Sequence, residues 1–213
     1  MAGSLRELLA IGSDPLGPPL RVEEPGITAD YGALGEQLFV TLCEKNGFYA
    51  FESALHVFPM AQGTALRGNL EEWNDSSLWK TSYGQLITQA FLCFAEDLFG
   101  GQFCICDAGI SRFDPETGGL KQVATDLEAW AQLVLDDYSF QTGHLLAREW
   151  QLINAPLPLG KRLVPSKPFV IGGDYKVSNL FAMDAAASMR LRGEIAQQIA
   201  RLPEGTEVEI EYR

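Results

Sequence analysis

The chain has 213 residues, of which 46% are hydrophobic and 21% are charged, a composition typical of a folded globular protein with a substantial core. Its 16 basic and 28 acidic side chains give a net charge of −12 at neutral pH. Proteins that bind nucleic acid need clustered basic side chains to neutralise phosphates, so this charge argues against that class of partner. An acidic chain instead suits a partner with a basic surface, or simply keeps the protein soluble.

The negative charge lies almost entirely in the first 150 residues, which hold 8 basic and 21 acidic side chains. Residues 1–25 have neither a basic start nor a long apolar stretch, so no signal peptide is expected. No apolar run approaches the roughly 20 residues that a helix needs to cross a bilayer. These features predict a cytoplasmic protein that has no membrane partner.

Glycine and proline are frequent in residues 1–26, which predicts an extended lead-in before a single domain over residues 27–213. Apolar residues then recur every four positions at Leu34, Leu38 and Leu42, which indicates one face of a helix. The domain is therefore expected to begin with a helix that packs on whatever follows it.

A second helix is expected to begin at Asn69, because Asn69 and Glu72 have the spacing of a capping box. A short strand over residues 55–58 precedes it. The helix carries Trp73, and Trp79 follows closely. Acidic neighbours surround both tryptophans, so partial exposure on a contact surface is an alternative to core packing for them.

The middle of the chain predicts an antiparallel sheet. Four short segments rich in strand-forming residues are separated by turns that contain glycine or aspartate. These segments are residues 86–94, 102–106, 110–113 and 120–123. Turns this short can join only antiparallel neighbours, so the four segments should form a meander.

The remainder of the chain adds helices and a few more strands around this meander. Two helices should carry Trp130 and Trp150 on their apolar faces, and residues 155–168 are a proline-rich connection. Further strands are expected at 169–171, 177–183 and 208–212, and a last helix at 191–202. Clustered strands flanked by helices, without regular alternation, indicate the α+β class.

No catalytic or metal site is assembled in the sequence. Two histidines, His56 and His144, are too few for a multi-histidine site, and Cys104-Ile105-Cys106 lacks the C-x-x-C spacing of zinc ligands. Nucleotide-binding loops and the serine-hydrolase elbow are absent as motifs. We therefore expect a protein that is not an enzyme and that binds no metal or organic cofactor.

Two central segments resemble the SMI/KNR-type proteins of the SUKH superfamily. They are F-A-E-D-L-F-G-G-Q-F over residues 94–103 and F-D-P-E-T-G over residues 113–118. Further segments extend the resemblance to residue 205: 127–130, 142–143, 162–165, 167–173, 179–180, 189–192, 195–199 and 202–205. The match is looser over residues 28–93, where the chain is also similar to immunity proteins that have a GAD-like N-terminal part and are paired with type VI secretion DNases.

The SUKH resemblance implies an α+β domain whose bacterial members act largely as immunity proteins, which bind and neutralise toxins delivered between competing cells. Those toxins are often nucleases, which must present a basic surface to nucleic acid, so an acidic blocker is their electrostatic complement. Eukaryotic relatives suggest a cytosolic scaffold or regulatory adaptor instead. A hydrolase with an unrecognised carboxylate site is the third alternative.

The predicted toxin-contact surface combines acidic side chains with one aromatic anchor. Its residues are Glu71, Glu72, Trp73, Asp75, Glu96 and Asp97. The first four share a short acidic helix, and the last two are expected at an exposed turn between strands. The alternative is that these carboxylates only solvate the surface and that Trp73 belongs to the core.

Overall fold

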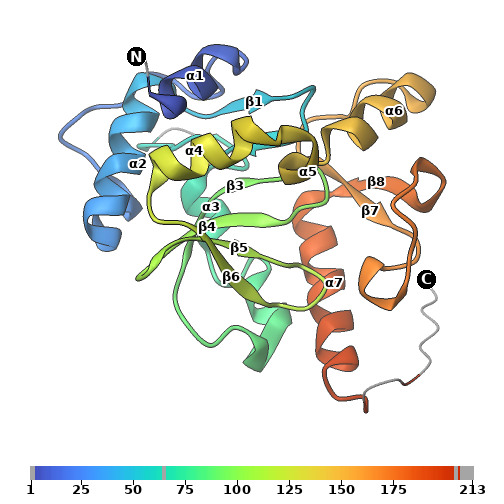
Figure 1. Ribbon diagram of the computed structural model, residues 1–213. Helices are drawn as coiled ribbons and strands as arrows, with labels where there is room; N and C mark the ends of the chain where they lie inside the picture. Colours follow the sequence, from blue (N-terminus) through green and yellow to red (C-terminus); the bar gives the residue numbers. More distant parts are fainter. Residues whose placement is uncertain (1–2, 64–65, 204–205, 207–213) are drawn as a thin grey trace.

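The computed structural model describes residues 3–63, 66–203 and 206, and its centre is a six-stranded antiparallel sheet in which the strands lie in chain order (Figure 1). The strands are β1 (Phe48–Ala50), β2 (Leu55–Val57), β3 (Leu92–Glu96), β4 (Gln102–Cys106), β5 (Gly109–Phe113) and β6 (Leu120–Ala124). The α+β class and the antiparallel meander expected from the sequence are confirmed.

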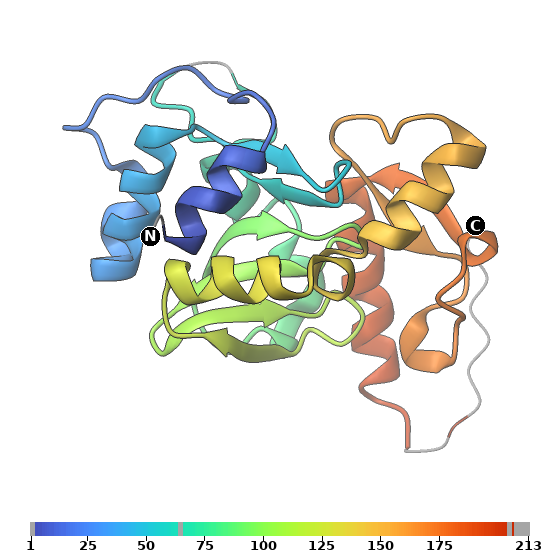
Figure 2. The same ribbon diagram turned by 45° about the horizontal axis from the view of Figure 1, so that its top comes forward.

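Helices cover both faces of this sheet. The helical elements are α1 (Ser4–Ile11), η1 (Gly26–Tyr31), α2 (Gly32–Glu44), α3 (Leu70–Asn74), η2 (Lys80–Leu86), α4 (Leu127–Asp136), α5 (Tyr138–Thr142), α6 (His144–Asn154), η3 (Phe169–Ile171), η4 (Val177–Asn179) and α7 (Ala185–Ile199). Helices α1, α2 and α4 pack on one face, and α3, η2 and α7 lie on the other (Figures 1 and 2). Within the described residues, no helix has the length and apolar character that a membrane span requires.

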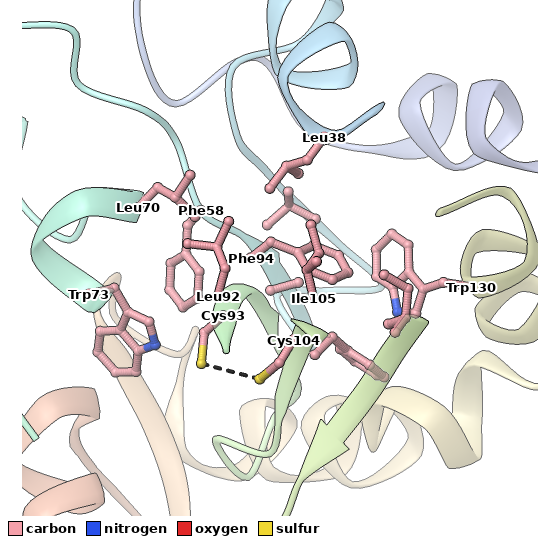
Figure 3. Close-up of a cluster of buried hydrophobic side chains, with 14 of the residues drawn as sticks. Leu38, Phe58, Leu70, Trp73, Leu92, Cys93, Phe94, Cys104, Ile105 and Trp130 are labelled. Atoms are coloured by element: carbon pink, nitrogen blue, oxygen red, sulfur yellow. Dashed lines mark hydrogen bonds between the residues drawn. The ribbon is translucent and has the colours of Figure 1, made fainter. Parts of the chain in front are cut away.

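The strand residues divide between the two faces as the pleat requires. On the α4 face, the rings of Phe94 and Phe103 lie 4.9 and 5.6 Å from that of Trp130. On the opposite face, the indole N–H of Trp73 donates to the side chain of Gln102 in β4 at 2.7 Å. Figure 3 shows Trp73 and Trp130 on the two sides of the strands.

Two cysteines meet in the centre of this core. Cys93 and Cys104 are opposite each other on β3 and β4, and their sulfur atoms are 3.2 Å apart (Figure 3). Both thiols are free and buried, as is Cys106, whereas Cys43 is half-buried. Burial raises the pKa of Cys104 well above its usual value, so this thiol stays protonated and unreactive.

The first part of the chain differs from the expected extended lead-in, because Ser4–Ile11 forms helix α1. Leu8 and Leu9 are buried in the same core as the main sheet. The Glu128 carboxylate of α4 accepts hydrogen bonds from the backbone N–H groups of Ser4 and Leu5 at the start of α1. These contacts hold α1 against α4, so the N-terminal residues belong to the folded unit.

The region before β3 also differs from the prediction. A strand was expected over residues 86–94, but Lys80–Leu86 forms the 3₁₀ helix η2 and β3 begins only at Leu92. Leu92 is the first residue of β3 with a partner on β4, which is Ile105, close to the turn that ends β4. Without a partner strand the preceding apolar residues cannot form a ladder, and Tyr83 is instead buried beside the sheet.

The C-terminal third builds a second, two-stranded sheet from β7 (Lys161–Pro165) and β8 (Leu180–Asp184). This corrects three expectations. The strand expected over 177–183 begins only at Leu180, after η4. Strand β7 lies in the predicted connection, and residues 169–171 form η3 rather than a strand. The 3₁₀ turn closes where Gly172, at φ +84°, donates its N–H to the Phe169 carbonyl at 3.0 Å. A smaller apolar core, which includes Leu98, Trp150 and Leu163, lies beneath this sheet.

Trp150 is buried in that smaller core and Trp130 in the main one, as expected for both. The strand expected over 208–212 lies outside the described residues.

Candidate functional site

A cleft of about 1140 Å³ opens beside the β5–β6 hairpin. Its other walls come from the α5–α6 corner and from the loop that carries η3, elements that can be followed in Figure 1. Strand β6 is half-exposed along its length, unlike β3 and β4, which are buried throughout. The edge of the sheet therefore stays open to solvent on this side.

Asp97 and Arg112 form an ion pair in the cleft wall. The other oxygen of Asp97, Oδ1, accepts the backbone N–H groups of Phe99 and Gly101, both at 2.8 Å. A Cβ atom at Gly101 would lie 2.6 Å from the Asp97 carboxylate, so this turn requires glycine. Asp97 thus holds the turn between β3 and β4 together and orients Arg112.

A second carboxylate in the cleft, that of Glu116, accepts a hydrogen bond from the described residues with only one of its two oxygens. Its Oε2 accepts the backbone N–H of Val170 at 2.8 Å, at the beginning of η3. Its Oε1 has no hydrogen-bond partner among the residues that the structure describes, although the side chain is 93% buried (7% exposed). Burial raises the pKa of Glu116, because the charged form loses its hydration there.

Three aromatic rings line the same cleft as Glu116. Phe169 and Tyr175 are stacked, with their centroids 3.9 Å apart and their planes 6° from parallel. Phe99 meets Phe169 edge-on at 5.3 Å. We call these three residues the aromatic wall of the cleft.

Apolar side chains project into solvent around the same cleft. Phe140, Leu145, Val170 and Tyr175 are 73%, 64%, 44% and 65% exposed, and all four line the cleft. We call these four residues the apolar rim. Large exposed apolar residues that gather around a concavity are typical of surfaces that bind proteins, membranes or small ligands.

The structure separates Trp73 from the acidic contact residues predicted on and next to α3. Trp73 is 4% exposed and belongs to the core, so it cannot be a surface anchor, and Trp79 is buried too. Glu72 is exposed, and the expected capping box is confirmed, because the Asn69 side chain accepts the Glu72 N–H at 2.8 Å. Glu71, half-buried, accepts the Ala61 N–H at 3.2 Å.

Asp75, the last acidic residue of this group, is exposed and accepts hydrogen bonds from Ser77 at 2.7 and 2.8 Å. Its pKa is lowered by these bonds. Glu71, Glu72 and Asp75 therefore remain together at the surface of α3, across the main sheet from α4 (Figure 2).

Glu96 and Asp97 were expected at an exposed turn, and both are buried. Glu96 lies 2.8 Å from the Nε of Arg162 and 3.0 Å from the Nδ1 of His56. Burial alone would raise the pKa of Glu96, but Arg162 and His56 outweigh it and lower that pKa. This charged cluster joins β2 and β3 of the main sheet to β7 of the second sheet, a structural role.

The cleft was missed because its residues are far apart in the chain. One feature of the sequence did point to the cleft. Residues 113–118 and 167–173, two of the segments that resemble the SUKH superfamily, meet here through the bond between Glu116 and Val170. No cluster of metal-ligating side chains occurs within the described ranges, and the predicted lack of metal and cofactor stays a prediction.

No protein-family model and no curated protein matches this chain. Among solved structures, the fold is similar to the crystal structure of Atu4351 from Agrobacterium tumefaciens, with a TM-score of 0.59 over 88% of this chain and 87% of that chain. The two sequences are 17% identical, so the similarity concerns the fold alone.

Proposed function

We propose that this chain is a cytoplasmic immunity protein that binds and neutralises a basic, nuclease-type toxin, as its resemblance to the SUKH superfamily implies. The observation that carries the proposal is the apolar rim around the cleft, a surface suited to a protein partner. The net charge of −12 adds the electrostatic complement of a nuclease.

In this proposal, the apolar rim contributes most of the binding free energy. Phe140 and Tyr175 are aromatic, and aromatic side chains are frequent among the few residues that dominate the affinity of an interface. The cleft between them accepts a projecting segment of the toxin. Binding at this position blocks the nuclease either at its active site or beside it.

Acidic side chains near the apolar rim supply the attraction at longer range. Asp114 lines the cleft and is exposed, and Asp136 and Asp137 are exposed at the junction of α4 and α5. Charges of this kind speed the association with a basic partner and make the rate depend on salt.

An immunity gene is expected to lie beside the gene of its toxin, so the decisive experiment uses the product of the neighbouring gene as the toxin. Cells that express this toxin should survive when they also express the wild-type chain, and the two purified proteins should form a complex that has no nuclease activity. Failure of the wild-type chain to bind or to neutralise that toxin overturns the proposal.

A pair of variants then tests the surface. Phe140→Ser with Tyr175→Ser removes the two aromatic side chains from the apolar rim and should weaken toxin binding by about 100-fold or more, because hot-spot residues each contribute about 2 kcal/mol or more. Val40→Ser is the matched control, since Val40 is an equally exposed apolar residue on α2, away from the cleft. Equal affinity of the wild type and both variants would place the interface elsewhere.

A further inference from the structure

Within the part of the chain that the structure describes, the buried carboxylate of Glu116 lacks a hydrogen-bond donor for one of its oxygens. One oxygen accepts a hydrogen bond from Val170, and the other has no hydrogen-bond partner among the described residues. A buried charged group with unfilled acceptor positions costs free energy, and a cationic donor from outside would remove that cost. We propose that Glu116 and the aromatic wall form a receptor for one arginine side chain of a partner protein.

The carboxylate is held in place before any ligand arrives. Its Oε2 is fixed to Val170, and the backbone N–H of Glu116 donates to the Asp114 carboxylate at 2.8 Å. The turn that carries this side chain is ordered without a ligand, whereas neighbouring side chains must shift to expose Oε1, which is buried. Preorganisation of this kind leaves more of the interaction energy available for affinity.

Three basic residues line the cleft: Arg112 and Arg192 donate to groups other than Glu116, and Lys121 is exposed on β6. Arg112 pairs with Asp97. Arg192 is buried and donates to the carbonyl groups of Phe99 and Ser188 and to the Ser188 hydroxyl. Burial raises the pKa of Glu116, and the charge of Arg192 offsets part of that rise. Neither arginine donates a hydrogen bond to Oε1, which still lacks a donor among the described residues.

The aromatic wall selects arginine over lysine. A guanidinium group is planar, so it stacks on an aromatic face while its N–H groups reach a carboxylate in the same plane. Tyr175 presents most of its side chain to solvent beside Glu116, and the Phe169 ring supports it from behind. Asp114, at the cleft mouth, adds a second negative charge.

This inference rests on the proposed function for the identity of the partner, because the basic surface of a nuclease supplies exposed arginines. The receptor itself can be tested without the toxin. The probe is N-acetyl-arginine amide, titrated into the labelled full chain and followed by the backbone amide signals. The comparison probe is the citrulline analogue, which has nearly the same shape and no charge.

The arginine probe should shift the signals of residues 114–118 and 169–175, and citrulline should not. Glu116→Gln keeps the acceptor for Val170 and removes the charge, so it should weaken arginine binding about tenfold or more while leaving the fold intact. Glu44→Gln is the matched control, because it removes one exposed carboxylate on α2. Equal shifts with both probes, or none up to the solubility limit of the arginine probe, overturn the inference.

The two proposals fail separately. If the arginine probe binds through Glu116 and the toxin does not bind, the receptor stands and the immunity function falls. If the toxin binds Glu116→Gln as tightly as the wild type and the probe does not bind, the receptor falls and the immunity function stands.

Discussion

Glu96 is the residue on which the charged cluster between the two sheets depends. Its carboxylate is the counter-ion of Arg162, which is itself buried. Glu96→Ala leaves that cation without a counter-ion, and we expect the free energy of unfolding in urea to fall by about 3–5 kcal/mol. The control is Glu24→Ala, which removes an exposed pair with Arg21 and should cost less than about 1 kcal/mol. Equal losses in the two variants would contradict this role.

His56 should make the stability of the fold depend on pH. Burial lowers its pKa below the usual 6.5, although Glu96 lies 3.0 Å from its Nδ1. The unfolded chain therefore binds a proton here more readily than the folded one, so this contribution is complete above pH 6.5 and is lost as the pH falls below that value. We expect urea unfolding of His56→Gln to show a weaker loss of stability over this range. If the stability of the variant falls with pH as steeply as that of the wild type, this role of His56 is contradicted.

At the scale of elements, the charges that steer a toxin should be those around α4–α6 and not those of α3. Two double variants change the net charge equally. One is Asp136→Lys with Glu149→Lys, and the other is Glu71→Lys with Glu72→Lys. The first pair lies on α4 and α6, the helices before and after α5, and the second pair lies on α3. The first variant should slow toxin association and reduce its salt dependence more strongly, because steering follows the local field.

Stopped-flow association at several salt concentrations measures this difference. Circular dichroism must show that both variants are folded, because the carboxylates of Glu71 and Glu72 accept backbone hydrogen bonds. A larger effect of the α3 variant would instead place the steering charges at the acidic residues of α3.

On the scale of the whole molecule, local patterns predicted the central meander. They could not predict which segments distant in sequence pack against it. The meander follows from turns too short for any other pairing, which is information contained within a few residues. Glu96 was expected to be exposed because its neighbours form a turn. It is buried because Arg162, distant in sequence, supplies a counter-ion when β7 passes beside β2 and β3. Burial of a charge depends on that partner, which a local pattern does not contain.

The candidate site was unpredictable for the same reason. Glu116 and Val170 are 54 positions apart in sequence, and neither segment alone indicates a cleft. The resemblance to the SUKH superfamily included both segments, but it did not indicate that they lie side by side. Their meeting, and the exposure of Phe140 and Tyr175 beside them, required the three-dimensional arrangement.

The two sheets should unfold as one cooperative unit. The Glu96–Arg162 pair and the hydrogen bond of 2.9 Å from the Leu163 N–H to the Leu98 carbonyl both join the second sheet to the main one. Leu163 is fully buried, so Leu163→Ala should remove about 2–5 kcal/mol of stability. If the sheets are coupled, hydrogen exchange should show the same loss of protection in β3 and β4 as in β7 and β8. Loss confined to β7 and β8 would instead show that the C-terminal third opens independently.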